Sequence, residues 1–563
     1  MNPRSLLSTR LERALAQCGT PAPPLVHTAS KPEFGHYQAD GIMAAAKRNR
    51  ANPRVLAERV LAALSAEDVA ESVEIAGPGF LNIRLSDAFL ARNLEAGAPL
   101  VETAAESRTV VVDYSSPNLA KEMHVGHLRS TIIGDAVARI LEALGHRVFR
   151  QNHVGDWGTQ FGMLLAHLNE TGGDSGALAD LEAFYRTAKA RFDADPDFAD
   201  SSRAMVVSLQ AGDEAARARW RQFIDVSLDH CQAVYERLGA SLTRADVMAE
   251  SAYNDDLPEV IAALDGKGLL TESEGARCVF LPGPEGEQPV IVQKSDGAYL
   301  YATTDLAAIR HRAHRLAADR VLYFTDSRQS LHFRQVFAVA AAAGFAGAAT
   351  SLEHMPFGNM LGRDGRPFRT REGSVVKLAE LLDEAEARAL EKITLRDSDS
   401  GTANRPAIAR AVGIGAVKYA DLSRSRTSDY VFDWDRMLSF EGNTAPYLQY
   451  AYARIQSLFR RGGIEPGSLA GPVRPRAPAE RSLAVALVRF EEVLDQAAAD
   501  GMPHLLCGYL YDLATKFTAF YEQCPILGAG SGERENRLRF ARRTARTLRA
   551  GLELLGIETV DRM

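Results

Sequence analysis

The sequence predicts a multidomain α/β protein that contains a doubly wound parallel sheet. First, its 563 residues exceed what one hydrophobic core usually serves, because domains run to roughly 100–200 residues. Second, the β-branched run Thr109–Tyr114 is typical of a buried parallel strand, and a loop, an apolar-periodic helix over Leu128–Leu144 and a strand from Val148 follow it. Third, from about Leu378 the chain is patterned almost entirely as amphipathic helix.

Residues before this unit mix helical and strand patterns. Leu6–Leu15 and Val55–Leu64 have helical spacing, whereas Val73–Ile75 and Phe80–Leu85 look like short strands around the turn 77–79. An α+β N-terminal domain is therefore expected.

The first residues, Met1–Gln17, alternate Leu and Ala with Arg and Glu, so they predict an amphipathic helix rather than a secretory signal. An organelle transit peptide is the alternative, against which Glu12 and the continuing pattern argue.

The middle and end of the chain add further elements. Residues 172–222 are charged and helical, which predicts an insertion over the sheet, and Gly462–Pro478 predicts a long loop inside the helical C-terminal region. Strand-like runs occur at Cys278–Leu281, Val290–Gln293, Tyr299–Thr303 and Val321–Thr325.

Composition excludes several classes of protein. Hydrophobic residues make up 46% and charged residues 24%, an ordinary globular balance, and no apolar run approaches the ~18–20 residues that span a bilayer. Five scattered cysteines without a C-x-x-C pair favour a reducing cytoplasm over a disulfide framework or a cysteine zinc site. The net charge of −7 means that any nucleic-acid contact must come from local basic patches.

Two histidines mark the point where the strand-following loop enters the helix. His124 and His127 flank Gly126 at a helix N-terminus, where unpaired amides and the helix dipole suit a phosphate. The imidazoles can donate hydrogen bonds to a phosphate that gains charge during an in-line displacement. Two alternatives remain: a metal site without a third ligand nearby, or two surface histidines at a helix cap.

The residues around this pair form a long ordered pattern. Residues 113–131 read Asp-Tyr-Ser-Ser-Pro-Asn-Leu-Ala-Lys-Glu-Met-His-Val-Gly-His-Leu-Arg-Ser-Thr, and residues 152–162 read Asn-His-Val-Gly-Asp-Trp-Gly-Thr-Gln-Phe-Gly. This set closely resembles class I arginyl-tRNA synthetases, with His124–His127 matching the HIGH signature of the class. The resemblance runs from Phe34–Gln38 to the C-terminal Leu555–Ile557 and Met563.

The resemblance implies an architecture and an activity. It implies a class I Rossmann-type catalytic domain with a parallel sheet, between an N-terminal α+β domain and a C-terminal all-α anticodon-binding bundle. The expected boundaries are 1–106 for the tRNA-contacting N-terminal domain, 107–385 for the catalytic domain with its insertion at about 172–222, 386–440 for a helical linker, and 441–563 for the anticodon-binding domain.

The implied reaction is the ATP-dependent ligation of L-arginine to tRNA(Arg) through arginyl-adenylate, with release of AMP and pyrophosphate. ATP would carry Mg²⁺ on its phosphates, no tightly bound protein metal is expected, and the enzyme would be a cytoplasmic monomer. Two rivals are a class I synthetase for another amino acid and an RNA-binding paralogue that has lost catalysis.

A second signature of the class, the KMSKS loop, has its candidate at Gly358–Arg371, with arginine at 366 and 369 where many relatives have lysine. Arginine keeps the charge but replaces a compact ammonium with a planar fork. The resemblance gives Lys121 the role of offsetting the missing lysine. A solvated glycine-rich turn is the alternative for the loop. The implied catalytic set is His124, His127, Lys121, Arg369 and Arg371, and ATP binding adds Gly126, Arg366 and Thr370.

A pocket that selects a guanidinium should present acids and neutral acceptors, because the group is planar, always charged and offers five donors. Tyr301 and Asp305 stand one turn apart if a helix starts there. By resemblance, Asp113, Tyr301 and Asp305 hold the guanidinium or other polar ends, Asn118 and Gln329 meet the α-amino group, Glu250 supports the site, and Ser115 completes the set. For each acid, a helix cap or a surface charge is the alternative.

A basic helix near the C-terminus predicts contact with RNA. Arg534–Arg549 holds seven arginines and one glutamate, and five of the arginines fall in one helical sector opposite a leucine- and alanine-rich face. These five are Arg539, Arg542, Arg543, Arg546 and Arg549. Phosphate contact is the functional interpretation, and a solvated face is the alternative. Tyr447 and Tyr450 are candidates for stacking on anticodon bases, although the aromatic residues of this region more often form core.

Overall fold

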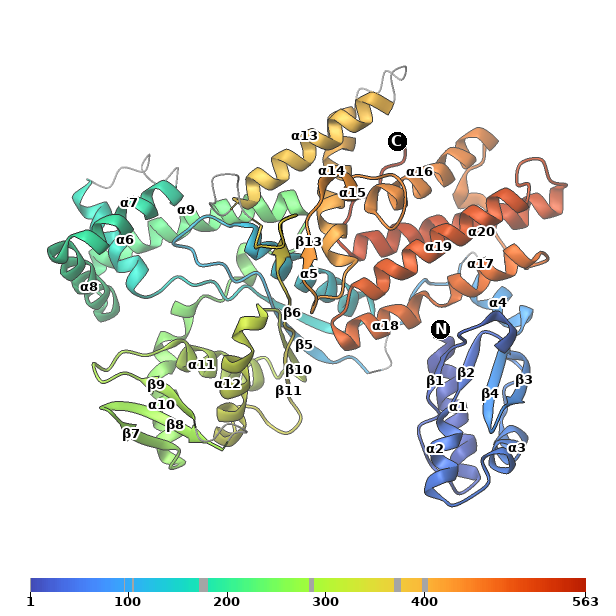
Figure 1. Ribbon diagram of the computed structural model, residues 1–563, viewed down its shortest axis with the longest axis horizontal. Coiled ribbons are helices and arrows are strands. Elements are labelled where there is room, and N and C mark those ends of the chain that lie inside the picture. The colour runs from blue at the N-terminus through green and yellow to red at the C-terminus, as the bar shows by residue number, and fades with distance from the viewer. Residues whose placement is uncertain are drawn as a thin grey trace. The chain divides into compact units, whose positions relative to one another are not determined.

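The computed structural model describes residues 2–95, 97–103, 106–171, 181–282, 288–368, 376–396 and 404–563. The chain forms two compact units (Figure 1). The central unit comprises Ala104–Leu438 and Leu555–Ile557, and the terminal unit comprises Met1–Thr103, Ser439–Leu554 and Glu558–Met563. The four-part division predicted from the sequence stays a prediction.

A parallel four-stranded sheet lies in the middle of the central unit (Figure 1). Its strands follow the order β11-β10-β5-β6, and their bounds are β5 Thr109–Asp113, β6 Arg147–Gln151, β10 Arg320–Tyr323 and β11 Ser351–His354. Val111 pairs with Val321, and both side chains are fully buried. The strand order reverses between β5 and β10, which is where open α/β sheets bind ligands. The predicted doubly wound sheet is confirmed.

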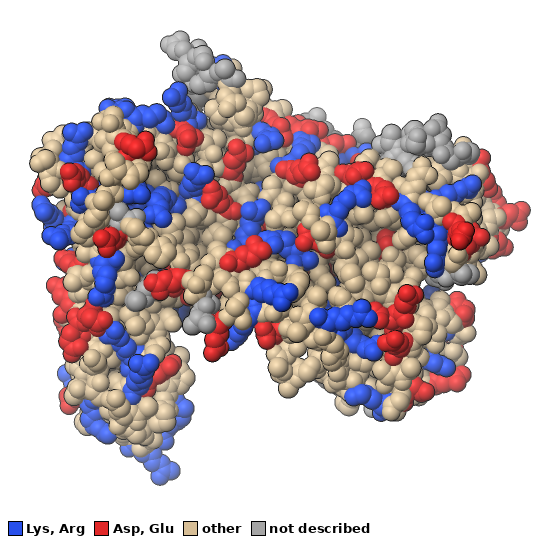
Figure 2. Space-filling model, turned by 180° about the vertical axis from the view of Figure 1, so that it is seen from behind, with Lys and Arg blue, Asp and Glu red and all other residues tan. Residues whose placement is uncertain are grey.

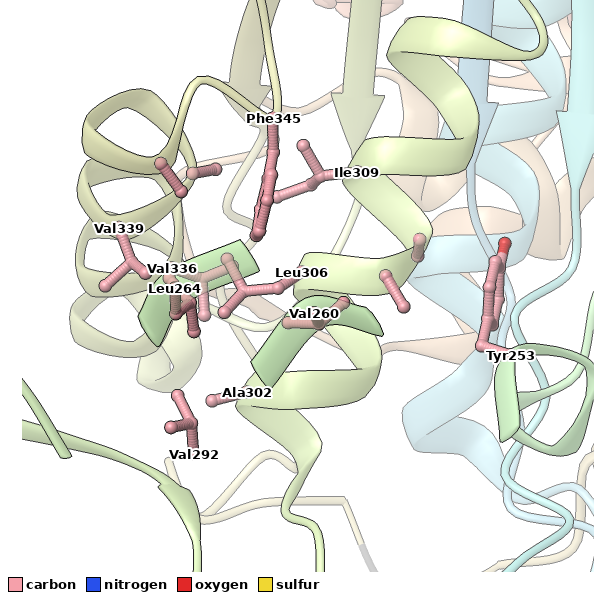
Figure 3. Close-up of a cluster of buried hydrophobic side chains, with 14 of the residues drawn as sticks. Tyr253, Val260, Leu264, Val292, Ala302, Leu306, Ile309, Val336, Val339 and Phe345 are labelled. Carbon is pink, nitrogen blue, oxygen red and sulfur yellow. The ribbon is translucent and has the colours of Figure 1, made fainter. Parts of the chain in front are cut away.

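Helix α5 (Leu128–Ala143) connects β5 to β6, as predicted, and α11 (Tyr301–His314) and α12 (Ser330–Ala343) pack beside β10 and β11. Figure 3 shows the cluster of buried side chains that joins α11 to α12, with Leu306 and Ile309 facing Val336 and Val339.

The predicted strand at Tyr299–Thr303 is wrong, because the helix begins at Tyr301. The short run Tyr-Leu-Tyr-Ala-Thr suits a strand locally, but Ala302, Leu306 and Ile309 recur at helical spacing and all are buried. The burial of this longer apolar face favours the helix, so the alternative of Tyr301 and Asp305 on one helical turn is correct.

Two small sheets complete the β structure of the central unit. Strands β7 (Leu270–Ser273), β8 (Ala276–Leu281) and β9 (Gln288–Gln293) form an antiparallel sheet, which confirms two predicted strands. β12 (Met360–Leu361) pairs in parallel with β13 (Tyr430–Val431).

The predicted insertion is helical where it is described, and residues 172–180 lie outside the described residues. Its last helix continues past the expected end at 222 to Leu238. Aromatic rings supply much of its packing: Phe161 meets Phe223 edge-to-face, and His167 packs on Phe184. The helices of this region are α6 Thr159–Glu170, α7 Leu181–Ala194, α8 Pro196–Ala211 and α9 Glu214–Leu238.

The other helices of the central unit are α10 Leu257–Gly266, α13 Leu378–Arg396, α14 Arg405–Leu422 and α15 Trp434–Met437. Lys418 on α14 is buried, and its Nζ donates to the carbonyls of Leu238 and Gly556, both at 2.6 Å. Burial lowers the pKa of Lys418 to about 8, although the carboxylate of Asp135 favours its charge. Leu555–Ile557 is thereby bound into the central unit.

The N-terminal part of the terminal unit contains a sheet of order β1-β2-β4-β3 with short helices. The predicted helices and strands are all present. The bounds are α1 Pro3–Gln17, β1 Val26–Thr28, β2 Tyr37–Ala39, α2 Gly41–Arg48, α3 Pro53–Ala63, β3 Ala70–Ala76, β4 Phe80–Leu85 and α4 Asp87–Asn93. Asn2 and Asn52 cap α1 and α3, each accepting from a backbone amide of the first turn.

The C-terminal part of the terminal unit is a helical bundle, in which α19 and α20 run side by side (Figure 1). Its helices are α16 Ala445–Gly462, α17 Pro478–Val488, α18 Phe490–Asp500, α19 His504–Gln523 and α20 Ser531–Leu554. The predicted loop separates α16 from α17 and holds one 3₁₀ turn, η7, at Pro466–Ser468.

Acidic and basic side chains are interspersed on the face drawn in Figure 2, in keeping with the small net charge. Within the described parts of the chain, no helix is both long enough and apolar enough to cross a membrane.

Candidate active site

A cavity of about 810 Å³ lies beside the carboxyl ends of β5 and β10. Its walls come from the loop after β5, the start of α11, the start of α12 and the segment before β12. Most residues that the sequence nominated for ATP and arginine line it: Asp113, Ser115, Asn118, His124, Gly126, His127, Glu250, Tyr301, Asp305 and Gln329. The volume suits small-molecule substrates.

The loop after β5 turns sharply at two serines. Ser115 and Ser116 have φ of 69° and 45°, in the left-handed region that non-glycine residues rarely adopt. The amide of Ser115 donates to Ser130 Oγ (2.9 Å), and the amide of Ser116 donates to Asn152 Oδ1 (3.0 Å). These bonds offset the strain. The Ser115 hydroxyl forms hydrogen bonds with the hydroxyls of Tyr235 and Thr131, so its partners in this structure are other side chains of the protein.

The two histidines form an interlocked pair at the short 3₁₀ helix η2 (Val125–His127). Their ring centroids are 4.0 Å apart. Each Nδ1 accepts a backbone hydrogen bond of 3.1 Å, that of His127 from the amide of His124 and that of His124 from the amide of Gly126. A Cβ on residue 126 would lie 2.7 Å from the ring of His124, so glycine is needed there. With both Nδ1 atoms occupied as acceptors, the neutral rings carry their protons on Nε2.

The pair is neutral at physiological pH. Burial, and then the proximity of His124, lowers the pKa of His127 to about 3, while burial and Lys121 lower the pKa of His124. Two neutral imidazoles that present N–H groups can donate to a phosphate. Among the described residues no group of three His, Cys, Asp or Glu could hold a metal ion, so the metal alternative for this pair finds no support.

Asp113 at the end of β5 lines the cavity, but its charge is already paired. Arg312 of α11 places Nη2 2.7 Å from Asp113 Oδ2, and the Ser116 hydroxyl donates to Oδ1 at 3.0 Å. The side chain of Arg312 is fully buried. Asp113 therefore lines the cavity with a carboxylate that is already paired, and its contact with the substrate stays a prediction.

Two other acids, Glu250 and Asp305, form an acidic wall of the cavity. Glu250 begins η5 (Glu250–Asp256), Asp305 lies on α11, and the charge of the buried Asp156 acts on Glu250. Burial, then Asp156 and Asp305, raises the pKa of Glu250 to about 8. Asp156 accepts from the amide and hydroxyl of Ser251, at 2.9 and 2.5 Å. A cation is the ligand that such a wall would bind best.

Two histidines contact this acidic wall. His332 Nε2 lies 2.6 Å from Asp305 Oδ2, and His153 Nε2 lies 4.0 Å from Asp305 Oδ1. Sequence reasoning assigned no role to these residues, nor to Arg312 or Asp156. His153 and Asp156 fall inside the pattern at 152–162 and could have been nominated from it, whereas Arg312 and His332 gave no signal.

Three family models match the chain. One described as "tRNA synthetases class I (R), catalytic domain" matches residues 90–434, "Arginyl tRNA synthetase N terminal domain" matches 5–85, and "DALR anticodon binding domain" matches 448–563. The chain belongs to the class I arginine–tRNA ligase family. The predicted family, fold class and enzyme class are thereby confirmed.

Relatives within the family match along the whole chain. The arginine–tRNA ligases of Hahella chejuensis and Cellvibrio japonicus are 55% and 54% identical, over 100% of this chain and 100% of theirs. The solved arginyl-tRNA synthetase of Thermus thermophilus has a TM-score of 0.84 at 27% identity, and that of Plasmodium falciparum a TM-score of 0.86 at 28% identity. The first covers 100% of both chains, and the second 100% of this chain and 99% of its own. These matches exclude the alternative that the chain belongs to a class I ligase family for another amino acid.

The basic residues expected near the phosphates of ATP fall into two groups. Lys121 and Arg366 are described residues that do not line the cavity: Lys121 Nζ lies 4.3 Å from the ring centroid of Tyr185 on α7, and Arg366 is exposed. Arg369, Thr370 and Arg371 lie outside the described residues. Pro367 and Phe368 do line the cavity, and Val376 bonds back to Val125, so the loop's described ends flank the histidine pair.

The prediction that α20 presents five arginines to solvent is wrong for Arg543. That side chain is buried, and its two Nη atoms donate to the carbonyls of Ala98 (2.7 Å) and Pro99 (2.9 Å). Burial lowers the pKa of Arg543 to about 10. Helical periodicity placed it on the polar side, but a segment distant in sequence covers that position.

The other arginines of this sector are partly engaged. Arg542 donates to the carbonyl of Leu469, and Arg539 and Arg549 pair with Glu535 and Glu553 one turn away, at 2.9 and 2.7 Å. Arg549 is the most exposed of the five.

The aromatic residues of the bundle also differ in how far they are exposed. Tyr447 is half-buried against Tyr511, with ring centroids 5.6 Å apart, whereas Tyr450 is 39% exposed. Tyr452, Phe517 and Phe520 are core residues.

Proposed function

We propose that this ligase activates L-arginine in the cavity beside the histidine pair and then transfers it to tRNA(Arg). The arginine carboxylate attacks the α-phosphorus of ATP, so that a new P–O bond forms as the bond to pyrophosphate breaks. A terminal ribose hydroxyl of the tRNA then attacks the arginyl carbonyl, loses its proton and displaces AMP. One observation supports this assignment above others: neutral imidazole donors and an acidic wall share one cavity.

The histidine pair would act on the phosphates. The fixed tautomer points Nε2–H donors at charge that develops on ATP, without reorganisation during the reaction. Neutral rings serve this purpose while adding no charge that ATP and its Mg²⁺ would have to balance. The Mg²⁺ enters as part of the ATP substrate, and the family match supports the use of ATP.

Lys121 would meet the phosphates only after its side chain leaves the ring of Tyr185. The lysine side chain is long and flexible, and a cation–π contact at a partly exposed site is worth about 0.5–1 kcal/mol, so this movement is accessible. Arg366, Arg369, Thr370 and Arg371 remain candidates for this role.

The acidic wall would hold the guanidinium. Asp305, Glu250 and the Tyr301 hydroxyl offer acceptors to its donors, while Asn118 and Gln329 would meet the α-amino group. Asp113 is now assigned a positioning role, because its pairing with Arg312 fixes the start of the Ser115–Ser116 turn.

The tRNA would bind to the helical bundle through exposed residues of α20 and α16. Arg549 and Tyr450 are the most exposed candidates, and Arg539, Arg542, Arg546 and Tyr447 are half-buried ones. Arg543 is withdrawn from this set. A monomeric state and a cytoplasmic location belong to the same proposal.

Aminoacylation of tRNA(Arg) with a panel of amino acids tests the function. Arginine should be attached, and lysine, ornithine and citrulline should not. Attachment of another amino acid, or tight tRNA binding without any aminoacylation, would refute the proposal, and the second result would identify an RNA-binding paralogue.

A further inference from the structure

The strongest unassigned contact in the cavity joins Asp305 to His332. The imidazole Nε2 donates to Asp305 Oδ2 at 2.6 Å, and the two side chains are 16% and 34% exposed. Both residues line the cavity. Their separation is fixed by the packing of α11 on α12, which Figure 3 shows for Leu306, Ile309, Val336 and Val339.

This contact gives the two carboxylate oxygens of Asp305 different surroundings. Oδ2 is taken by His332, while Oδ1 faces His153, whose Nε2 is 4.0 Å away. His153 donates from Nδ1 to the carbonyl of Met248 at 3.1 Å, and its Nε2 is too far from Asp305 Oδ1 for a hydrogen bond. With respect to the described residues, Oδ1 therefore remains open to a ligand that brings its own donors.

We propose that His332 is a positioning residue of the arginine site, which holds Asp305 Oδ2 so that only Oδ1 receives the guanidinium. This inference rests on the proposed binding of arginine to Asp305. With one oxygen available, the guanidinium cannot form a two-bond fork with Asp305 alone and must share its donors with Glu250.

His332→Gln and His332→Leu form the test. Glutamine places an amide donor near the position of Nε2, and leucine keeps the volume without a donor. Steady-state aminoacylation, with saturating ATP and tRNA, gives the arginine KM and kcat of each protein. At pH 8 we expect the arginine KM of His332→Gln to stay within about threefold of the unsubstituted enzyme and that of His332→Leu to rise roughly tenfold or more, with the ATP KM unchanged in both.

An arginine KM that is unchanged in His332→Leu, or that rises equally in His332→Gln and His332→Leu, would overturn the proposal. Parallel changes in the arginine KM, the ATP KM and the thermal stability would also overturn it. Failure of the unsubstituted enzyme to charge tRNA with arginine would instead refute the proposed function.

Discussion

Arg312 and Asp113 form a buried ion pair, Nη2 to Oδ2 2.7 Å, and Asp113 lines the cavity that we propose to bind arginine. The protein's own guanidinium thus occupies one of the acids that the sequence nominated for the substrate. The pair joins the end of β5, where the loop to the histidine pair begins, to α11, the helix that carries Tyr301 and Asp305.

Removal of Arg312 should destabilise the protein strongly. Arg312→Met leaves the carboxylate of Asp113 buried without its partner, which costs about 3–5 kcal/mol of unfolding free energy. Arg312→Met with Asp113→Asn should recover a large part of that loss, since neither charge remains. Urea unfolding of the three proteins measures the effect, and equal losses in the single and double variants would contradict it.

His127→Ala should reduce arginyl-adenylate formation by roughly 100–1,000-fold, the cost of losing one preorganised donor to developing charge. Arginine-dependent pyrophosphate exchange, assayed with tRNA present, reports this step. The dissociation constant for tRNA should be unchanged in the same variant. Exchange at the normal rate would remove His127 from the phosphate site.

Asp305→Ala should raise the arginine KM by roughly 100-fold, because a partly buried guanidinium loses a charge partner at a cost of several kcal/mol. Asp305→Asn keeps the shape and the neutral acceptor and should give a smaller increase. The ATP KM serves as the internal control. If arginine KM does not change in either variant, the guanidinium binds elsewhere.

Glu250 should make the stability of the free enzyme fall as the pH rises. Burial, with Asp156 and Asp305, raises the pKa of Glu250 from 4.5 to about 8, so between these values the folded state keeps a proton that the unfolded state releases. The folded state then binds more protons, and the free energy of unfolding decreases with pH until Glu250 ionises in both states.

The substitution Glu250→Gln should remove this decrease of the unfolding free energy with pH. Relative to the unsubstituted enzyme, the variant should gain unfolding free energy steadily from pH 5 to pH 8 and then level off. Denaturant titrations at pH 5, 7 and 9 without arginine test the trend. A difference that does not vary with pH would mean that Glu250 is already ionised in the folded protein.

Charge reversal on α20 should separate RNA contact from folding. Arg549→Glu should weaken tRNA binding and reduce the slope of log affinity against log salt by about 1, at no cost to the melting temperature. Arg543→Glu should instead lower the melting temperature, because that position is buried against the carbonyls of Ala98 and Pro99. The opposite pattern would show that Arg543 is the residue that meets the RNA.

Local patterns in the sequence predicted those elements whose burial is periodic. The run Thr109–Asp113 is a buried strand, and the apolar spacing over Leu128–Leu144 matches α5, because in both cases the neighbours along the chain determine the pattern. Tyr299–Thr303 failed since five residues cannot distinguish a strand from the first turn of a helix whose apolar face extends beyond them.

The residues of the site fall into two groups, those that a local sequence pattern could nominate and those that it could not. The histidine pair and the acids could be nominated from one ordered pattern and from the chemistry of a guanidinium. The partner of Asp113, the contact of His332 with Asp305 and the burial of Arg543 all depend on segments far apart in the chain, and no local property of Arg312, His332 or Arg543 reveals them.

The hydrogen bond from Lys418 to the carbonyl of Gly556 has a consequence for folding during synthesis. The central unit is assembled from Ala104–Leu438 and from Leu555–Ile557, and the whole helical bundle is translated between these segments. During synthesis on the ribosome, the ammonium of Lys418 lacks one of its two acceptors, the carbonyl of Gly556, until α20 has emerged. The central unit can therefore reach its final form only after release of nearly the entire chain, so nascent polypeptides that end early lack the piece that closes it.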